Sequence, residues 1–134
     1  MTLEDLNLHL DMVNQLKSAR ESLEYLEARL LGAQQFDGMP HGSGTSRKVE
    51  NFSLVLKEQS EDVIRLERVV QKSEKSIRKW IDTIPDNRTK LIFKLRFVCG
   101  MKWDDVAQSI GADNSSDSVR SICRYYLNKT NSTE

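Results

Sequence analysis

The sequence predicts an all-α protein. Only two prolines and six glycines occur among its 134 residues, and 30% of the residues are charged. Apolar residues recur every three to four positions over most of the chain, which is the period of a helix rather than the alternation of a strand. The length suits one compact domain, or one small domain on an extended support.

Charge is spread unevenly along a chain whose net charge is zero. Residues 1–40 carry three Lys/Arg against seven Asp/Glu, whereas residues 65–82 carry six against three and residues 83–134 carry eight against six. A basic C-terminal part suits an anionic partner, although solvated helix faces produce the same asymmetry.

The start of the chain, MTLEDLNLHLDM, lacks the basic and then apolar order of a signal peptide. No stretch approaches the ~18 apolar residues of a membrane span. We therefore expect a cytoplasmic protein without membrane contact. Cys99 and Cys123 lie among apolar residues at helical spacing and too far apart for a C-x-x-C motif, so we expect two buried free thiols.

Two long helices are expected in the first part of the chain. The first covers residues 3–31 and ends at Gly32, and the glycine-rich segment GAQQFDGMPHGSGTS predicts a linker over residues 32–46. The second covers residues 47–83 and carries a heptad seam, which has to pair with another helix. The seam positions are Val49, Phe52, Leu56, Gln59, Val63, Leu66, Val70, Ser73, Ile77 and Trp80.

The matching lengths of these helices predict an antiparallel hairpin. Aligning Leu30 with Val49 places four pairs of opposite charge beside each other, and such pairs select a register rather than drive association. The pairs are Glu4–Lys75, Asp11–Arg68, Lys17–Asp62 and Arg29–Glu50. The same seam can pair instead between two copies of the chain, and the sequence leaves both pairings open.

A three-helix head is expected to follow this hairpin, so that residues 1–83 and 84–134 form the two predicted domains. Pro85 ends the seam helix, and a helix in DNRTKLIFKLRFVCG ends at Gly100. The next helix, in MKWDDVAQSIG, ends at Gly111, which we expect to adopt a positive φ. The predicted core residues of these two helices are Leu91, Ile92, Leu95, Val98, Trp103, Val106, Ala107 and Ile110.

The last two helices of this head have the order of a helix-turn-helix. Val119 follows Gly111 by eight positions, two more than in the compact motif, and the segment between them is rich in turn and cap formers. We therefore expect a lengthened loop, an N-cap at Asn114 or Ser115, and a recognition helix over about residues 115–128. Its predicted core face is Val119, Ile122, Cys123 and Tyr126, and its predicted outer face is Ser116, Asp117, Arg120, Ser121 and Arg124.

Arg120 and Arg124 are four residues apart and share one helix face, where guanidinium groups can reach guanine edges or phosphates of DNA. The alternative is that they are ordinary solvated charges. Further candidates for phosphate contacts are Lys102, Lys90 and Lys94.

The segment LRFVCGMKWDDVAQSIG followed by SVRSICRYYL resembles region 4 of bacterial RNA polymerase sigma factors, the helix-turn-helix that reads the −35 promoter element. With the seam helix and the GMPHGSG linker, the whole order is similar to small phage-encoded and prophage-encoded sigma-like regulators. The resemblance implies a DNA-binding transcriptional regulator with base contacts from the outer face just described. Nothing resembles the region that melts the −10 element, so a complete sigma factor is not expected.

No catalytic or metal site is expected. His9 and His41 are isolated from other metal ligands, and the PHGSG segment has no strand before it and no lysine after it that would indicate a phosphate-binding loop. No nucleophile has a base nearby in the sequence, so we expect neither an enzyme nor a cofactor.

Two functions follow from these patterns. The first is a sequence-specific DNA-binding regulator of phage or prophage type, with double-stranded DNA, RNA polymerase and a second copy of the chain as expected partners. The alternative is a coiled-coil scaffold, or a phage packaging or assembly protein, whose head docks a protein.

Overall fold

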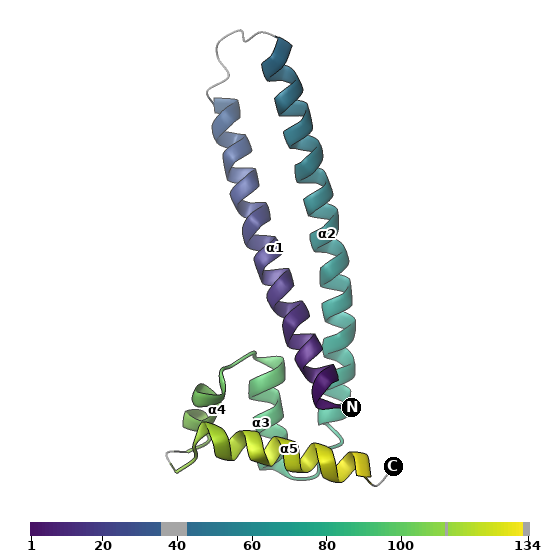
Figure 1. Cartoon of the computed structure of the whole chain (residues 1–134), viewed down its shortest axis with the longest axis vertical. Coiled ribbons are helices and arrows are strands. Elements are labelled where there is room, and N and C mark those ends of the chain that lie inside the picture. The colour runs from purple at the N-terminus through teal and green to yellow at the C-terminus, as the bar shows by residue number, and fades with distance from the viewer. Residues whose placement is uncertain (36–42, 112, 133–134) are drawn as a thin grey trace. The chain divides into compact units, whose positions relative to one another are not determined.

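The protein is all-α, as the sequence predicts. A computed structural model describes residues 1–35, 43–111 and 113–132, and these residues form helices and turns without a strand. No helix in the described ranges combines the length and the apolar character needed to cross a membrane. The elements are α1 (Leu3–Gln35), α2 (Ser43–Ile81), α3 (Asn87–Phe93), the π-helix η1 (Lys94–Val98), α4 (Trp103–Ile110) and α5 (Ser116–Ser132) (Figure 1).

Both long helices extend into the segment predicted as a linker. α1 continues past Gly32 to Gln35, and α2 begins at Ser43. A single glycine inside a helix costs only about 1 kcal/mol relative to alanine, so Gly32 does not end a helix whose neighbouring turns are favourable. The middle of the predicted linker, residues 36–42, and His41 within it lie outside the described residues.

Contacts divide the chain into two compact units. We call Met1–Met12 with Val70–Glu134 the terminal unit, and Val13–Val69 the two-helix unit. The terminal unit contains the first turns of α1, the last turns of α2 and all of the shorter helices. Its hydrophobic core consists of Leu6, Ile77, Ile81, Ile84, Ile92, Phe93, Phe97, Val106, Ala107, Val119, Cys123 and Leu127.

Aromatic rings connect the helices of the terminal unit. Trp80 meets the edges of Phe93 and Tyr126 at centroid distances of 5.1 and 6.0 Å. Phe97 stacks on Phe93 at 5.9 Å and meets Trp103 edge-on at 6.1 Å. Because aromatic pairs in these geometries add to the energy of burial, the rings fix α3, η1, α4 and α5 against the end of α2.

The predicted core face of residues 91–98 is partly wrong. Ile92 is buried, but Leu91 is 44% exposed, and the side chains that fill the core are Phe93 and Phe97. Leu91 and Phe93 both precede η1, and the buried Thr89, Ile92, Phe93 and Phe97 have the spacing of one face of a regular helix, so the predicted face is displaced around the helix from the observed one. Gly100, with φ 71°, then ends the segment as expected.

The heptad seam of α2 is sheltered along its whole length. All ten predicted positions are buried or half-buried, including the polar Gln59 and Ser73. In the terminal unit, Ser73 meets the buried His9, and their Oγ and Nδ1 atoms lie 2.8 Å apart in a hydrogen bond. In the two-helix unit, α1 and α2 are joined by Arg20 and Glu67.

The predicted register between α1 and α2 is wrong. The predicted alignment places residue 70 opposite His9 and residue 59 opposite Arg20, three and eight positions from the observed partners Ser73 and Glu67. None of the four predicted ion pairs forms, although all of their side chains belong to the described residues. The buried pair His9–Ser73 indicates a shift of about one helical turn. Because seam positions recur every three to four residues, such a shift keeps apolar residues opposite one another, and exposed charges contribute too little to prevent it.

Candidate nucleic-acid interface

The candidate interface is built on α5, whose start is fixed by a reciprocal cap. The Ser118 N–H donates to Ser115 Oγ at 3.2 Å, and the Ser115 N–H donates to Ser118 Oγ at 3.0 Å. Ser115 is thus the N-cap, one of the two predicted positions. This cap satisfies backbone groups at the first turn of the helix. The start of α5, and with it the direction of the side chains that follow, is therefore well defined.

The inner face of α5 packs into the core of the terminal unit. Val119, Cys123 and Leu127 are buried, and Ile122 and Tyr126 are half-buried. The predicted core positions are therefore confirmed, with Leu127 in addition. Burial raises the pKa of the Cys123 thiol to about 12, against a smaller opposing effect of Arg96, so this thiol stays protonated. The other thiol, Cys99, is exposed rather than buried, because it follows the end of η1.

The opposite face of α5 carries the predicted contact residues. Arg120, Arg124, Asp117 and Ser121 are exposed, and Ser116 is half-buried at the start of the helix. Within the described residues, neither arginine forms an ion pair with a carboxylate. Since residues four apart lie one above the other on a helix, the two guanidinium groups lie on one solvent-facing side.

Of the remaining predicted candidates, Lys94 and Lys102 are exposed and Lys90 is half-buried. Lys102 immediately precedes α4, where no side chain caps the helix. Sequence reasoning missed two further residues on the outer side of α5. Tyr125 is 71% exposed, and Asn128 lies four residues after Arg124 and is also exposed. Extending the 3.6-residue period beyond Arg124 would have identified both.

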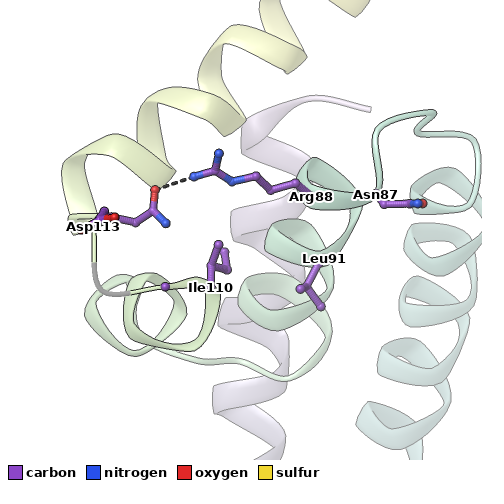
Figure 2. Close-up of a pocket in the computed structure, with 7 residues that line it drawn as sticks. Asn87, Arg88, Leu91, Ile110 and Asp113 are labelled. Carbon is purple, nitrogen blue, oxygen red and sulfur yellow. Dashed lines mark hydrogen bonds between the residues drawn. The ribbon is translucent and has the colours of Figure 1, made fainter.

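The loop between α4 and α5 is held to α3. Gly111 has a φ of 153°, as a glycine can adopt, and its carbonyl accepts from the Asn114 N–H at 3.2 Å. Asn114 does not cap α5 but accepts a hydrogen bond at Oδ1 from Arg88 Nη2 (Figure 2). The neighbouring Ala112 lies outside the described residues.

An open depression of about 620 Å³ lies beside this loop, and Figure 2 shows the side chains around it. Leu91 and Ile110 provide its apolar part, and Arg88 provides a cation. Its lining also includes Asn87, Gly111, Asp113 and Asn114. The exposure of Leu91 is therefore connected with a surface feature rather than with a packing defect.

Arg96, on η1, is a third residue that sequence reasoning missed. Its Nη1 donates to the Met101 carbonyl oxygen at 2.8 Å, and its guanidinium carbon lies 4.8 Å from the centroid of the Trp103 ring. These contacts place a cation against the start of α4. No sequence signal indicates them, because they depend on the π-helix and on the turn at Gly100.

Among the described residues, no group of three or more His, Cys, Asp or Glu side chains could hold a metal ion. The candidate interface therefore consists of the exposed arginines and polar side chains on the outer face of α5. Comparison of the chain with protein-family models, with curated proteins and with solved structures finds no match.

Proposed function

We propose that the protein is a sequence-specific DNA-binding regulator of transcription, of phage or prophage type, in which α4 and α5 act as a helix-turn-helix and α5 enters the major groove. The observation that carries the proposal is the pair Arg120 and Arg124, which are exposed, one turn apart and free of protein carboxylates among the described residues. Guanidinium groups read guanine O6 and N7 in that groove.

The packing of α5 supports this proposal. Its buried face is fixed by Val119, Cys123 and Leu127, and its first turn is capped by Ser115, so the outer side chains are presented without a cost for ordering the helix on binding. The polar Ser121 and Asn128 share the outer side with the arginines and add hydrogen-bonding groups that suit base edges or phosphates.

A single three-helix head is not expected to provide the whole affinity for DNA. One such module buries only about 600–1,000 Å² on DNA, and the segment 83–134 carries eight Lys/Arg against six Asp/Glu. We therefore propose that the long helices recruit either a second copy of the chain or RNA polymerase. With a second copy, the binding site contains two half-sites at a fixed spacing.

The test begins with selection of preferred sequences from a random duplex library, followed by fluorescence anisotropy at several salt concentrations. Arg120→Ala with Arg124→Ala should abolish the preference for the selected sequence, because each bidentate base contact discriminates by about 1–3 kcal/mol. The matched control is Arg65→Ala with Arg68→Ala on α2, which removes two arginines outside α5 and should preserve the preference.

Two outcomes would contradict the proposal. If the control loses binding as severely as the α5 variant, the interaction depends on total charge rather than on the outer face of α5. If the wild-type protein shows no salt-sensitive binding to any duplex, DNA is not the ligand, and a scaffold or packaging role becomes the better hypothesis.

A further inference from the structure

In the two-helix unit, α1 covers the heptad seam of α2 unevenly. Val63 is 6% exposed, and Glu67, one turn further along, accepts a hydrogen bond from Arg20 of α1, so this side of α2 faces α1. Leu66 also belongs to the predicted seam, but it is only half-buried. Val69, three residues beyond Leu66, is 44% exposed. One flank of the seam is therefore left largely uncovered by α1.

The residues of this uncovered flank form a second heptad pattern. They are separated by alternating steps of three and four, so they lie in one line along the helix. Four of the six are apolar, and all six are half-buried or exposed. We call them the α2 stripe, which consists of Phe52, Val55, Gln59, Asp62, Leu66 and Val69. At 1.5 Å per residue, the stripe is about 26 Å long.

The opposite flank of the seam lacks this apolar character. The residues at the same spacing there carry hydroxyl, amine or carboxylate groups with one exception, and they are Ser53, Lys57, Ser60, Ile64 and Glu67. Polar side chains suit water, whereas four apolar side chains in one line suit a second helix. Within the described part of the two-helix unit, the elements are α1 and α2 alone, so a helix that covers the α2 stripe would belong to another molecule.

The α2 stripe is complementary to a second copy of itself that runs in the opposite direction. Its steps of 3-4-3-4-3 residues read the same from either end, so an antiparallel copy matches it position by position. Each apolar residue then faces an apolar residue of the second copy, and the polar residues face each other. The facing pairs are Phe52–Val69, Val55–Leu66 and Gln59–Asp62.

The polar residues of the stripe favour this antiparallel arrangement over a parallel one. Among the described residues, the side-chain amide of Gln59 has no hydrogen-bond partner, and the carboxylate of Asp62 is paired only with Arg65 of the same helix, at 3.0 Å. An amide N–H can donate to a carboxylate, and two-fold symmetry forms this contact twice. In a parallel pair, Asp62 would face Asp62 of the second copy, and the like charges would repel each other.

We propose that the α2 stripe is a dimer interface, which binds the α2 stripe of a second, antiparallel copy of the chain. Such an interface has two-fold symmetry, because the same surface is used by both copies. The proposal names the partner of the long helices, for which a second copy and RNA polymerase were both considered above. Its consequence for DNA, a site with two half-sites at a fixed spacing, rests on the proposed function.

The first experiment measures the mass of the full chain by sedimentation equilibrium, without DNA. The wild-type protein should be a dimer at micromolar concentration. By symmetry, Val55→Glu places two carboxylates against apolar residues of the interface, and should raise the Kd of the dimer by about tenfold or more. The matched control is Leu54→Glu, which places the same charge on the neighbouring residue, 56% exposed and outside the stripe, and should leave the Kd unchanged. Thermal melting by circular dichroism verifies that both variants fold.

The second experiment tests the antiparallel direction with two variants of one residue. Gln59→Lys places an ammonium group opposite Asp62 of the second copy, so the dimer should keep its Kd or become tighter. Gln59→Glu places a carboxylate opposite the same Asp62 and should raise the Kd by about tenfold or more. In a parallel pair, residue 59 faces its own copy, so equal weakening by both variants would overturn the antiparallel register.

Other outcomes would overturn the interface itself. A wild-type chain that stays monomeric at high micromolar concentration would do so, and would leave RNA polymerase as the expected partner of the long helices. A dimer that Val55→Glu weakens no more than Leu54→Glu does would show that the copies meet through another surface.

Because the mass is measured without DNA, the failure of this proposal is distinguishable from the failure of the proposed function. A dimer that responds to Val55→Glu but binds no duplex would support the α2 stripe as an interface and overturn the proposed function. A monomeric wild-type chain that binds a selected duplex would overturn the interface and leave the proposed function standing.

Discussion

The terminal unit and the two-helix unit are stabilised in different ways. In the terminal unit, each helix contributes to one continuous cluster of buried side chains, and Phe93, Ile92 and Val106 are fully buried. In the two-helix unit, the buried side chains among the described residues are Leu16 and Val63, and the other seam positions remain half-exposed. A pair of helices can cover only one side of each member, whereas helices packed in several directions enclose a core.

This difference has consequences for function. Under the proposed function, the packed core of the terminal unit holds the outer face of α5 in one orientation, which sequence-specific contacts would require. The two-helix unit leaves Leu54, Val55 and Ile64 at least 50% exposed. Because this unit has few buried side chains, we expect substitutions in it to lower the free energy of unfolding by less than substitutions in the terminal unit.

The largest effect is expected in the terminal unit. Phe93→Ala removes a fully buried ring that contacts Trp80, Phe97 and Tyr126, and should lower the free energy of unfolding by about 3–5 kcal/mol. Urea denaturation followed by circular dichroism measures this loss. Leu91→Ala, on the same helix but 44% exposed, is the control and should cost about 0.5 kcal/mol. Equal losses would show that Phe93 is not part of a tightly packed core.

A smaller loss is expected in the two-helix unit. Leu16 is 5% exposed, but it belongs to a unit with few other buried side chains, so the site can collapse around a smaller residue. Leu16→Ala should therefore cost about 2 kcal/mol, near the lower end of the range for such changes. The matched control is Leu54→Ala in the same unit, where the side chain is 56% exposed. A loss as large as that of Phe93→Ala would contradict the difference between the units.

The sequence was sufficient to predict the elements whose pattern is local. The α2 seam follows from the spacing of Val63, Val70 and Ile77, because a heptad repeat needs only one helix to be recognised. The register of α1 against α2 could not be predicted, because seam positions recur every three to four residues and shifts by one helical turn also pair apolar residues. The burial of Phe93 and Phe97 rather than Leu91 could not be predicted, because apolar residues occur on more than one side of the helix over residues 91–98 and periodicity alone does not decide which side packs inward.

The candidate site likewise has one part that the sequence could predict and one part that it could not. The outward direction of Arg120 and Arg124 follows from the core positions on the other side of α5, such as Val119 and Cys123. Arg96 could not be recognised, because its contacts with Met101 and Trp103 arise from the packing of η1 against α4. Periodicity identifies which side of a helix faces water, but not which residues of neighbouring elements come into contact.

The contact between α1 and α2 in the terminal unit should respond to pH through His9. Burial lowers the pKa of His9 from its usual 6.5, and the carboxylate of Glu74 opposes this effect only in part. As the pH falls below about 6.5, the imidazole is protonated in the unfolded chain before it is protonated in the folded protein. Proton uptake then favours unfolding, so stability should be lost as the pH falls from 6.5 towards the folded pKa.

Urea denaturation between pH 7.5 and pH 5 would measure this dependence. His9→Gln removes the titrating group but retains the ability to bond Ser73, and should flatten the dependence on pH in this range. Asp5 and Asp86 have lowered pKa values, caused by hydrogen bonds from Thr2 and Thr89 respectively, so their contributions are lost only at more acidic pH, below about 4. A pH dependence that persists unchanged in His9→Gln would contradict this assignment.

The smallest effect is expected for the ion pair between Arg20 and Glu67, which joins α1 to α2 in the two-helix unit. Their side chains are 53% and 35% exposed, and exposed pairs contribute about 0–1 kcal/mol. A double-mutant cycle with Arg20→Ala and Glu67→Ala should therefore give a coupling energy of about 0.5 kcal/mol that declines as salt is added. The pair Asp62–Arg65, within α2, provides a more exposed control that cannot affect the register. If the seam rather than charge holds the helices together, both couplings should be small, and a value above about 2 kcal/mol for Arg20 and Glu67 would mean that this pair selects the register by itself.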